Sequence, residues 1–275
     1  MKTLKYILIL TMMLFVALQS ASAGNITLAG STSVMNYIEA AAKLYSKTHP
    51  DITFSISGGG SQVGYLMAKN GRVHIGMMSR NLSTKELSDI EKIKVVPFAY
   101  DAVIPVISDA VFLTTGLFKI DIRDLINIYQ GKITNWQEVG GPDRLILAIH
   151  LGHGHGGRYI FDRHILKGVE VKKDFKPVTV GSYKHVQTLI KASDQAIAYI
   201  GSNYPNEQAH RVPLMINGKL IHPTRESIVN GTYPLSRNLN LLLADDAPAH
   251  VRDFVNFVLS NKGQKLVDRL GYVPL

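Results

Sequence analysis

The stretch ITLAGSTSVMNYIEAAAKLY, residues 26–45, begins as a strand and ends as a helix. Ile26–Leu28 is a short apolar run, and the five small residues 29–33 that follow it include one glycine and three hydroxyl side chains. From Val34 to about Thr48, apolar residues recur at helical spacing until His49-Pro50 ends the pattern. The stretch therefore predicts a strand, a turn rich in small polar residues, and a helix.

The same arrangement occurs twice more in the next fifty residues. Ile52–Ser57 alternates as a strand, and the sequence GGGS at 58–61 leads into a helix near 62–70. Val73–Met77 is a third strand, and Ser79-Arg80 precedes a helix near 84–91. This alternation of strand and helix predicts an α/β fold with parallel strand pairs.

These three turns suggest an anion site. In open α/β sheets, ligands gather at the carboxyl ends of the strands. The N-terminus of a helix carries unsatisfied N–H groups and the positive end of its dipole, so it favours anions. One such turn is equally explained by ordinary helix capping with serine or threonine. Three in succession on one sheet edge favour a binding site.

The remainder of the chain continues the alternation and contains neither an internal repeat nor a long Pro/Gly/Ser linker. We expect strands near 94–99, 102–107, 145–150, 178–180, 196–200 and 239–243. We expect helices near 121–129, 158–166, 247–260 and 262–270, and a hairpin around Asn217-Gly218. This pattern fits two lobes joined by strands rather than two independent domains joined by a linker.

The first 23 residues have the pattern of a secretory signal. Lys2 and Lys5 precede the apolar run Tyr6–Leu18, and Ala21-Ser22-Ala23 offers a cleavage site, which we place after Ala23. The run is shorter than the ~20 apolar residues of a membrane anchor. The chain has no cysteine, which excludes disulfides, thiolate metal sites and lipid attachment. We expect a soluble periplasmic protein.

The distribution of charge along the chain argues against nucleic acid as a partner. The formal charge is +9, and Lys2 and Lys5 lie in the expected leader, which has no acidic residue, so the mature chain would carry +7. Its basic residues are scattered rather than gathered into a stripe. A positive field of this kind raises the local concentration of small anions.

Seven stretches, in this order and spacing, resemble the periplasmic phosphate-binding protein family, the substrate-binding components of phosphate ABC transporters. They are AGSTSVMNYIEAAAKLY at 29–45, SGGGSQVG at 57–64, IGMMSRNL at 75–82, GKITNWQEVGG at 131–141, AIAYIG at 196–201, NGTYPLSR at 230–237 and FVLSNKGQKLVDRLGYVPL at 257–275. The resemblance covers nearly all of the mature chain.

The resemblance implies a two-lobed type II periplasmic binding-protein fold, in which each lobe is a mixed sheet flanked by helices and two strands form the hinge. Lobe 1 would comprise residues 24–102 and 199–275, and lobe 2 residues 103–198. Phosphate, or a related oxyanion, would lie dehydrated in the cleft between them. The implied partner is an inner-membrane ABC transporter permease, and the chain would act as a monomer without a cofactor.

The resemblance also implies ligand residues. Ser31 and Thr32 match the ligands of the first loop, and Ser61 matches that of the second. The third loop has Ser79-Arg80, as one branch of the family does, where another branch has an aspartate. Arg80 would either contact the ligand or form a salt bridge across the mouth of the cleft.

The segment HLGHGHGGRYIFD, residues 150–162, departs from the family pattern. The family has an arginine and then Gly-Ser-Gly-Thr-Arg here; this chain has Leu151 in place of the arginine, His155 in place of the serine and Gly157 in place of the threonine. The backbone N–H groups of Gly156, Gly157 and Arg158 remain at the predicted helix start. Because a hydrogen bond to a charged group contributes roughly 1.5–3 kcal/mol, the loss of three needs compensation or a changed ligand.

The histidines of this segment allow two interpretations. His150, His153 and His155 could chelate zinc, nickel or copper if the segment is extended, although no cysteine or acidic cluster completes such a site. Alternatively, His155 and His153 donate N–H bonds to an anion, and binding then strengthens as the pH falls. His150 also fits a strand residue without a ligand role. We favour the anion interpretation and predict no metal site.

No motif in the chain indicates catalysis. The sequence has no Gly-x-Ser-x-Gly elbow, no His-Glu-x-x-His and no P-loop lysine. We therefore expect no catalytic residue. The alternative from another class is a non-transport protein on the same scaffold, either a metal-binding module or an interaction or sensor protein with an altered anion site.

Overall fold

The computed structural model describes residues 24–204 and 209–275. The expected leader, residues 1–23, lies outside the described residues. Within the described ranges, no helix is both long and apolar enough to cross a membrane.

The first half of the chain forms three strand–turn–helix units. They are β1 (Gly24–Gly30) with α2 (Thr32–Tyr45), β2 (Ile52–Gly59) with α3 (Ser61–Lys69), and β3 (Ile75–Met78) with α4 (Thr84–Ser88). β1 pairs in parallel with both β2 and β3, as the alternation predicts. α2 begins two residues earlier than expected because the Ser31 side chain accepts the Val34 N–H and so caps the helix at that point.

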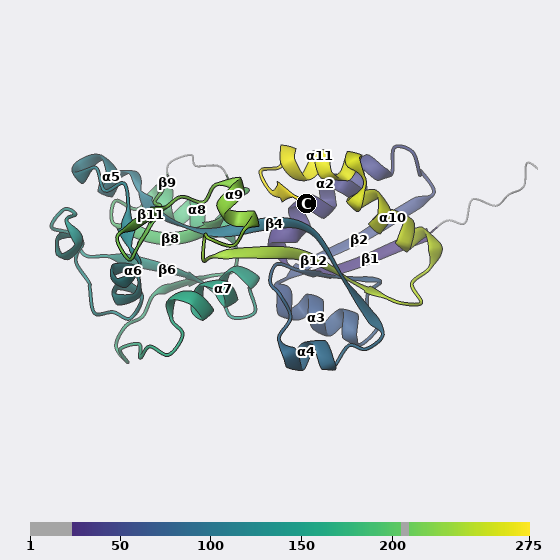
Figure 1. Ribbon diagram of the computed structural model, residues 1–275, viewed down its shortest axis with the longest axis horizontal. Helices are drawn as coiled ribbons and strands as arrows, with labels where there is room; N and C mark the ends of the chain where they lie inside the picture. The colour runs from purple at the N-terminus through teal and green to yellow at the C-terminus, as the bar shows by residue number, and fades with distance from the viewer. Residues whose placement is uncertain (1–23, 205–208) are drawn as a thin grey trace, which may run out of the picture.

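Two long strands connect the halves of the molecule. β4 (Ile93–Ser108) is one 16-residue strand where we expected two shorter ones, and β12 (Ser236–Ala244) pairs antiparallel with its first part. The later part of β4 pairs with β8 (Ala196–Gly201). In Figure 1, β4 runs from one half of the molecule into the other.

The second half repeats the layered arrangement. Its elements are α5 (Asp109–Thr115), β5 (Ile120–Asp121), α6 (Ile122–Tyr129), a 3-10 turn (Trp136–Val139), β6 (Leu147–Leu151), α7 (Gly156–Ile165), β7 (Val178–Val180), α8 (Tyr183–Ala192), β8, β9 (Ala209–Arg211), β10 (Leu214–Ile216), β11 (Lys219–Ile221) and α9 (Arg225–Val229). β10 and β11 form the expected hairpin. The main sheet follows the order β2-β1-β3-β12-β4-β8-β6-β7.

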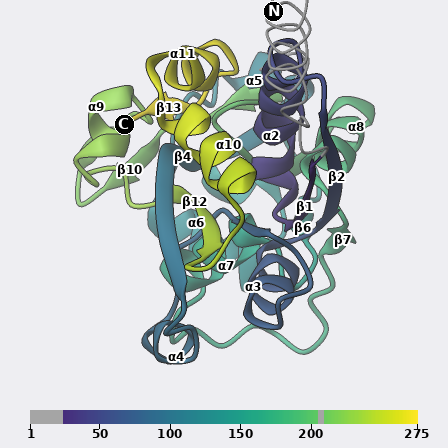
Figure 2. The ribbon, with the colours of Figure 1, turned by 90° about the vertical axis from the view of Figure 1, so that its right-hand side faces the viewer.

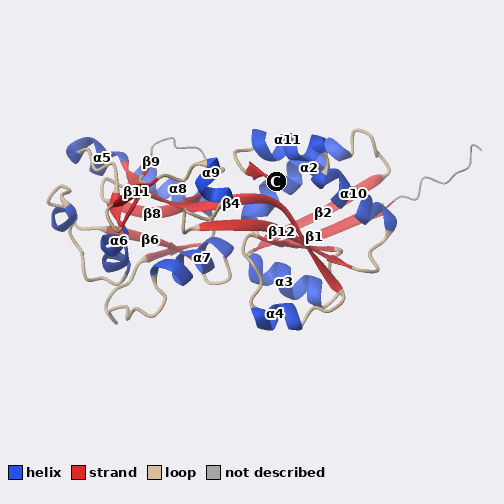
Figure 3. Cartoon of the chain, viewed as in Figure 1, coloured by secondary structure: helices blue, strands red, loops and turns tan. Residues whose placement is uncertain are grey.

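Helices cover both faces of this sheet, as Figure 3 shows. In the first half, α2 and the C-terminal helices α10 (Ala249–Leu259) and α11 (Asn261–Arg269) lie on the face opposite α3 and α4 (Figure 2). The chain ends in β13 (Val273–Pro274), which pairs with β4. The alternation of buried strands and amphipathic helices thus yields two layered units around shared strands.

Each half has its own hydrophobic core. One core forms around β1, α2, α10 and α11 and includes Tyr37 and Phe98; the other forms around β6, α7 and β8 and includes Phe161 and Tyr199. Residues 209–235, which we assigned to lobe 1, contribute Val212, Leu214 and other side chains to the core of the second half. The lobe boundaries as a whole stay a prediction.

Candidate functional site

Three buried serines meet at the carboxyl edge of the sheet. Ser31, Ser61 and Ser79 follow β1, β2 and β3, and because these strands are parallel their ends lie side by side. Ser31 Oγ donates to Ser79 Oγ at 2.8 Å, and Ser61 Oγ lies 3.3 Å from Ser79 Oγ. We call Ser31, Ser61 and Ser79 the serine cluster. It gathers three hydroxyl groups away from bulk water.

A loop of the second half touches this cluster. Residues 154–158, which we call the glycine loop, comprise the turn before α7 and the first residues of that helix. A Cβ atom on Gly156 would lie only 2.2 Å from Ser79 Oγ and 2.6 Å from Ser61 Oγ. The Gln62 N–H also donates to the Gly154 carbonyl at 3.3 Å. Only a glycine at position 156 allows this approach of the two halves.

Two helices point uncapped N-termini at this contact. His155 is the N-cap residue of α7 and Gly60 that of α3, and neither supplies a side-chain capping hydrogen bond. The first N–H groups of a helix have no partner within the helix itself. They carry partial positive charge and therefore complement an anion.

A buried arginine borders the serine cluster. Arg237, on β12, donates from Nη1 to Ser79 Oγ at 3.3 Å and from Nε to Asp101 at 3.0 Å, and both side chains of this ion pair are fully buried. Asp101 also accepts the N–H groups of Ala102 and Ser202. The Asp101 carboxylate thus accepts hydrogen bonds from several donors, and the Arg237 guanidinium places a positive charge beside the hydroxyl groups of the serine cluster.

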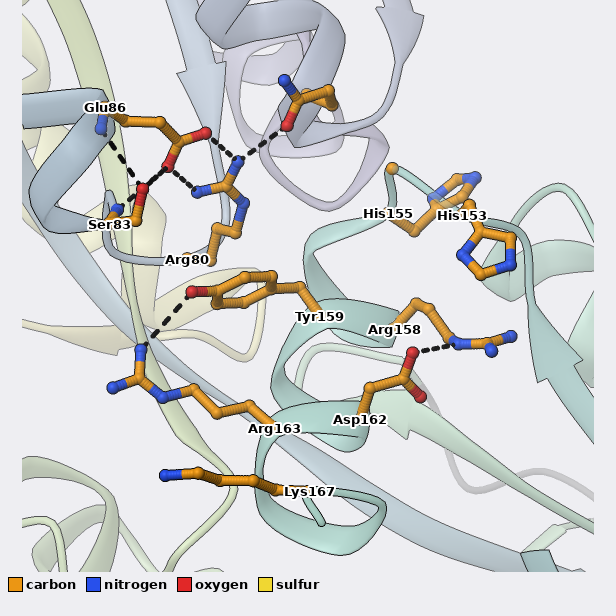
Figure 4. A pocket seen from close by; sticks show the side chains of 12 residues that line it. Arg80, Ser83, Glu86, His153, His155, Arg158, Tyr159, Asp162, Arg163 and Lys167 are labelled. Carbon is orange, nitrogen blue, oxygen red and sulfur yellow. Dashed lines mark hydrogen bonds and ion pairs between the residues drawn. The ribbon is translucent and has the colours of Figure 1, made fainter. Parts of the chain in front are cut away.

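A groove of about 510 Å³ opens beside the glycine loop. Figure 4 shows Arg80 on its wall, paired with Glu86 through two hydrogen bonds of 2.7 Å. Burial alone would raise the pKa of Glu86, but the hydrogen bonds from Arg80 and Ser83 hold it below its usual value. The Arg80 guanidinium also lies over the Tyr159 ring of α7, 4.7 Å from its centre. Arg80 therefore bridges the two halves at the groove.

Arg158 and His150 belong to a separate network beneath the glycine loop. Arg158 donates to the Leu151 carbonyl at 3.0 Å and pairs with Asp162. His150 is buried between Asp162 and the Tyr199 hydroxyl, and burial lowers its pKa. The side chains of Arg158 and His150 are thus engaged within the second half, where they hold the loop in place.

The other two histidines do not lie on a strand. β6 ends at Leu151, so His153 and His155 occupy the turn that follows, and the extended geometry needed for chelation is not formed. His153 is exposed on the groove. His155 is half-buried, and burial, followed by the charge of Arg237, lowers its pKa. Within the described ranges there is no group of three or more His, Asp or Glu residues that could hold a metal ion.

The structure brings some of the expected ligands together and separates others. Ser31, Ser61 and Gly156 meet at the serine cluster, whereas Gly157 lies against the Tyr183 hydroxyl group. Thr32 lies in the first turn of α2 with its methyl group near Gly58. The side chains of Arg80 and Arg158 are engaged elsewhere, as described above. The ligand roles of all these residues stay a prediction.

Sequence reasoning missed two members of the site. Ser79 was treated only as the neighbour of Arg80, although its place after β3 matches that of the other two serines. Arg237 ends the stretch NGTYPLSR at 230–237, which carried the resemblance, but no local pattern joins it to Asp101 or Ser79. Both contacts are long-range and follow only from the folded sheet.

With this geometry in view, the class of the protein is defined by comparison with known families. The model of the PBP superfamily domain matches residues 16–262. The chain therefore belongs to the PBP superfamily, and the predicted α/β fold of a periplasmic binding protein is confirmed.

Particular relatives carry more specific names. The phosphate-binding protein PstS of Bacillus subtilis is 26% identical over 258 residues, which cover 94% of this chain and 83% of that protein. A substrate-binding protein of Clostridium perfringens, solved with bound phosphate, has a TM-score of 0.81 at 27% identity and covers 91% of this chain and 99% of its own. An ABC-type phosphate transport receptor of Vibrio cholerae has a TM-score of 0.74 at 28% identity, with 91% and 100% covered.

Proposed function

We propose that this protein is a solute-binding protein that holds inorganic phosphate, or a related tetrahedral oxyanion, between its two halves and delivers it to an ABC transporter. The observation that carries the proposal is the serine cluster facing the uncapped start of α7. Relatives named for phosphate binding or transport, at 26–28% identity over most of the chain, support it.

The chemistry of the site suits a dehydrated anion. Hydroxyl groups, helix N–H groups and a buried guanidinium all donate, and hydrogen bonds to a charged acceptor contribute roughly 1.5–3 kcal/mol each. Ser79 and Arg237 supply a hydroxyl and a guanidinium that compensate for those lost from the glycine loop. The proposed ligands are Ser31, Thr32, Ser61, Ser79, Arg237 and the backbone N–H groups of Gly156, Gly157 and Arg158, with His155 and Arg80 at the edge of the site.

Delivery requires the halves to separate and rejoin. Gly156 lies against Ser61 and Ser79, so a ligand enters when the glycine loop moves away from the serine cluster. The strands β4 and β12 connect the halves and serve as the hinge. The anion favours the closed state because only that state brings donors from both halves to it. Lobe 1 (24–102 with 199–275) and lobe 2 (103–198) would each move as a unit. Residues 209–235 are the exception within lobe 1, since they pack in the core of the second half and would move with lobe 2.

The cellular location that we propose follows from the expected leader. A protein released by cleavage after Ala23 acts outside the cytoplasm, and in a double-membraned cell it would meet the permease from the periplasmic side. We assign it no enzymatic step, and we expect a monomer. No observation favours the alternative of a metal-binding or interaction module.

Titration calorimetry with phosphate, sulfate and zinc tests the proposal. We expect phosphate to bind one-to-one with micromolar or tighter affinity. Zinc binding without phosphate binding would favour the metal-binding alternative. Binding of sulfate without binding of phosphate would show that the ligand is sulfate and not phosphate.

A further inference from the structure

Tyr183 has a buried hydroxyl group without an assigned role. It is the first residue of α8, its side chain is 2% exposed, and its ring lies in the core of the second half. By distance and angle the hydroxyl group has no hydrogen-bond partner among the described residues, and the one side chain that acts on it as a weak donor is the Arg237 guanidinium. Buried polar groups in folded proteins nearly always have partners, so an exception indicates a function or a missing ligand.

The hydroxyl group lies beside the proposed anion site. A Cβ atom on Gly157 would lie 1.9 Å from the Tyr183 oxygen, which therefore lies directly against the glycine loop. Gly156, the next residue, makes the corresponding close approach to Ser79. The Arg237 guanidinium, which donates to Ser79, lies over the Tyr183 ring at 5.8 Å from its centre. Tyr183, Arg237 and the serine cluster thus border the same space.

Packing does not explain the hydroxyl group. The ring contacts Tyr204 at 5.1 Å between centres, and a phenylalanine would keep this contact. Burial raises the pKa of Tyr183, and although the charge of Arg237 lowers it, the balance leaves the phenol protonated at neutral pH. A guanidinium can only donate to the phenol oxygen, so the phenol proton is without an acceptor and is available to donate a hydrogen bond.

We propose that the Tyr183 hydroxyl is a ligand of the bound oxyanion, donating to a deprotonated oxygen beside Gly157. This proposal rests on the proposed function. It also explains the glycine at position 157, because any side chain there would take the place of the hydroxyl group. The neutral phenol adds a donor without adding charge, so it selects anions with an unprotonated oxygen on this side.

The substitution Tyr183→Phe separates binding from folding. We expect phosphate affinity, measured by titration calorimetry, to fall roughly 10- to 150-fold, the loss of one hydrogen bond to a charged group. The urea midpoint of the ligand-free protein should stay or rise, because the substitution removes an unpaired hydroxyl. The control is Tyr129→Phe, in the same core, where the hydroxyl donates to the Ile149 carbonyl at 2.9 Å. That control should lower the urea midpoint and leave affinity unchanged.

Three outcomes overturn the proposal. Wild-type affinity in Tyr183→Phe refutes Tyr183 as a ligand while leaving phosphate binding intact. A fall in the urea midpoint like that of Tyr129→Phe assigns the hydroxyl to folding. Absence of binding by the wild-type protein to phosphate and sulfate refutes the proposed function and this ligand together. Gly157→Ala gives a second test of the contact. Because the added methyl group would collide with the Tyr183 hydroxyl, the substitution should lower the urea midpoint more in the wild-type background than in the Tyr183→Phe background.

Discussion

Gly156 and Ser79 lie so close that a Cβ atom on the glycine would stand 2.2 Å from the serine hydroxyl oxygen. One residue begins α7 in the second half, and the other follows β3 in the first. Their approach defines where the halves meet. It also places helix N–H groups opposite buried hydroxyl groups, which is the arrangement that an oxyanion requires.

The first prediction concerns this contact. Gly156→Ala should weaken phosphate binding by roughly 5- to 150-fold, because overpacking by one methyl group costs about 1–3 kcal/mol and here acts on the closed state. Gly152→Ala is the matched control, since its Cβ would meet no atom closer than 3.8 Å. Equal phosphate affinities for the two variants, measured by calorimetry, would show that the contact between Gly156 and Ser79 does not affect binding.

The second prediction concerns the buried ion pair of Arg237 and Asp101. Asp101→Asn should lower the free energy of unfolding by about 3–5 kcal/mol, because it leaves a buried guanidinium without its counter-charge. Asp194→Asn, which breaks the exposed pair with Arg144, should cost about 0–1 kcal/mol. Urea denaturation measures both. A cost at Asp101 as small as that at Asp194 would show that the buried charge is compensated elsewhere.

The third prediction concerns the pH dependence of binding. Burial and the charge of Arg237 lower the pKa of His155, so it is neutral at pH 7.5. Because a bound anion favours its protonation, affinity gains a contribution as the pH falls towards this lowered pKa. The ratio of dissociation constants between His155→Gln and wild type should therefore rise from pH 7.5 to pH 5. This ratio cancels the ionisation of phosphate itself, and a constant ratio would exclude His155 as a ligand.

The fourth prediction concerns the pH dependence of stability. Burial lowers the pKa of His150 below its unfolded value of about 6.5, so the unfolded state binds a proton more readily. The stability from neutral His150 is complete above that pH and is lost as the pH falls towards the folded-state pKa. The slope is up to about 1.4 kcal/mol per pH unit.

His150→Gln isolates this effect. The variant should unfold more readily at pH 7.5, because the contacts with Asp162 and Tyr199 are changed, and its stability should fall less steeply from pH 7 to pH 5. Parallel slopes in urea denaturation series would mean that His150 does not titrate in this range.

Local patterns predicted the early units of the fold well. In residues 26–78 each strand, small polar turn and helix follows from hydrophobic spacing and capping chemistry, and the observed bounds differ by at most three residues. The helix α8 was missed. Its Ser182 cap and the spacing of Tyr183, Val186 and Ile190 indicate a helix, but the polar residues between them weaken the signal.

The binding site was predicted less completely, for a physical reason. Ser31 and Ser61 follow from their turns, because a turn is a local feature of sequence. Arg237 and Tyr183 reach the same place from β12 and α8, and only the sheet order determines that they meet. The interpretation of the glycine loop as a departure from the family pattern stays a prediction, and the donors that we propose as compensation are distant in sequence.

The most direct test of the account is a crystal structure of the mature protein grown with saturating phosphate. We predict one tetrahedral anion within hydrogen-bond distance of the Ser61 and Ser79 hydroxyl groups and of the Gly157 N–H. Gly156 would shift only far enough to admit the anion and would stay beside the serine cluster, where a methyl group would still be crowded. Phosphate bound only in the outer groove near Arg163 and Lys167, with Gly156 still against Ser79, would contradict the account.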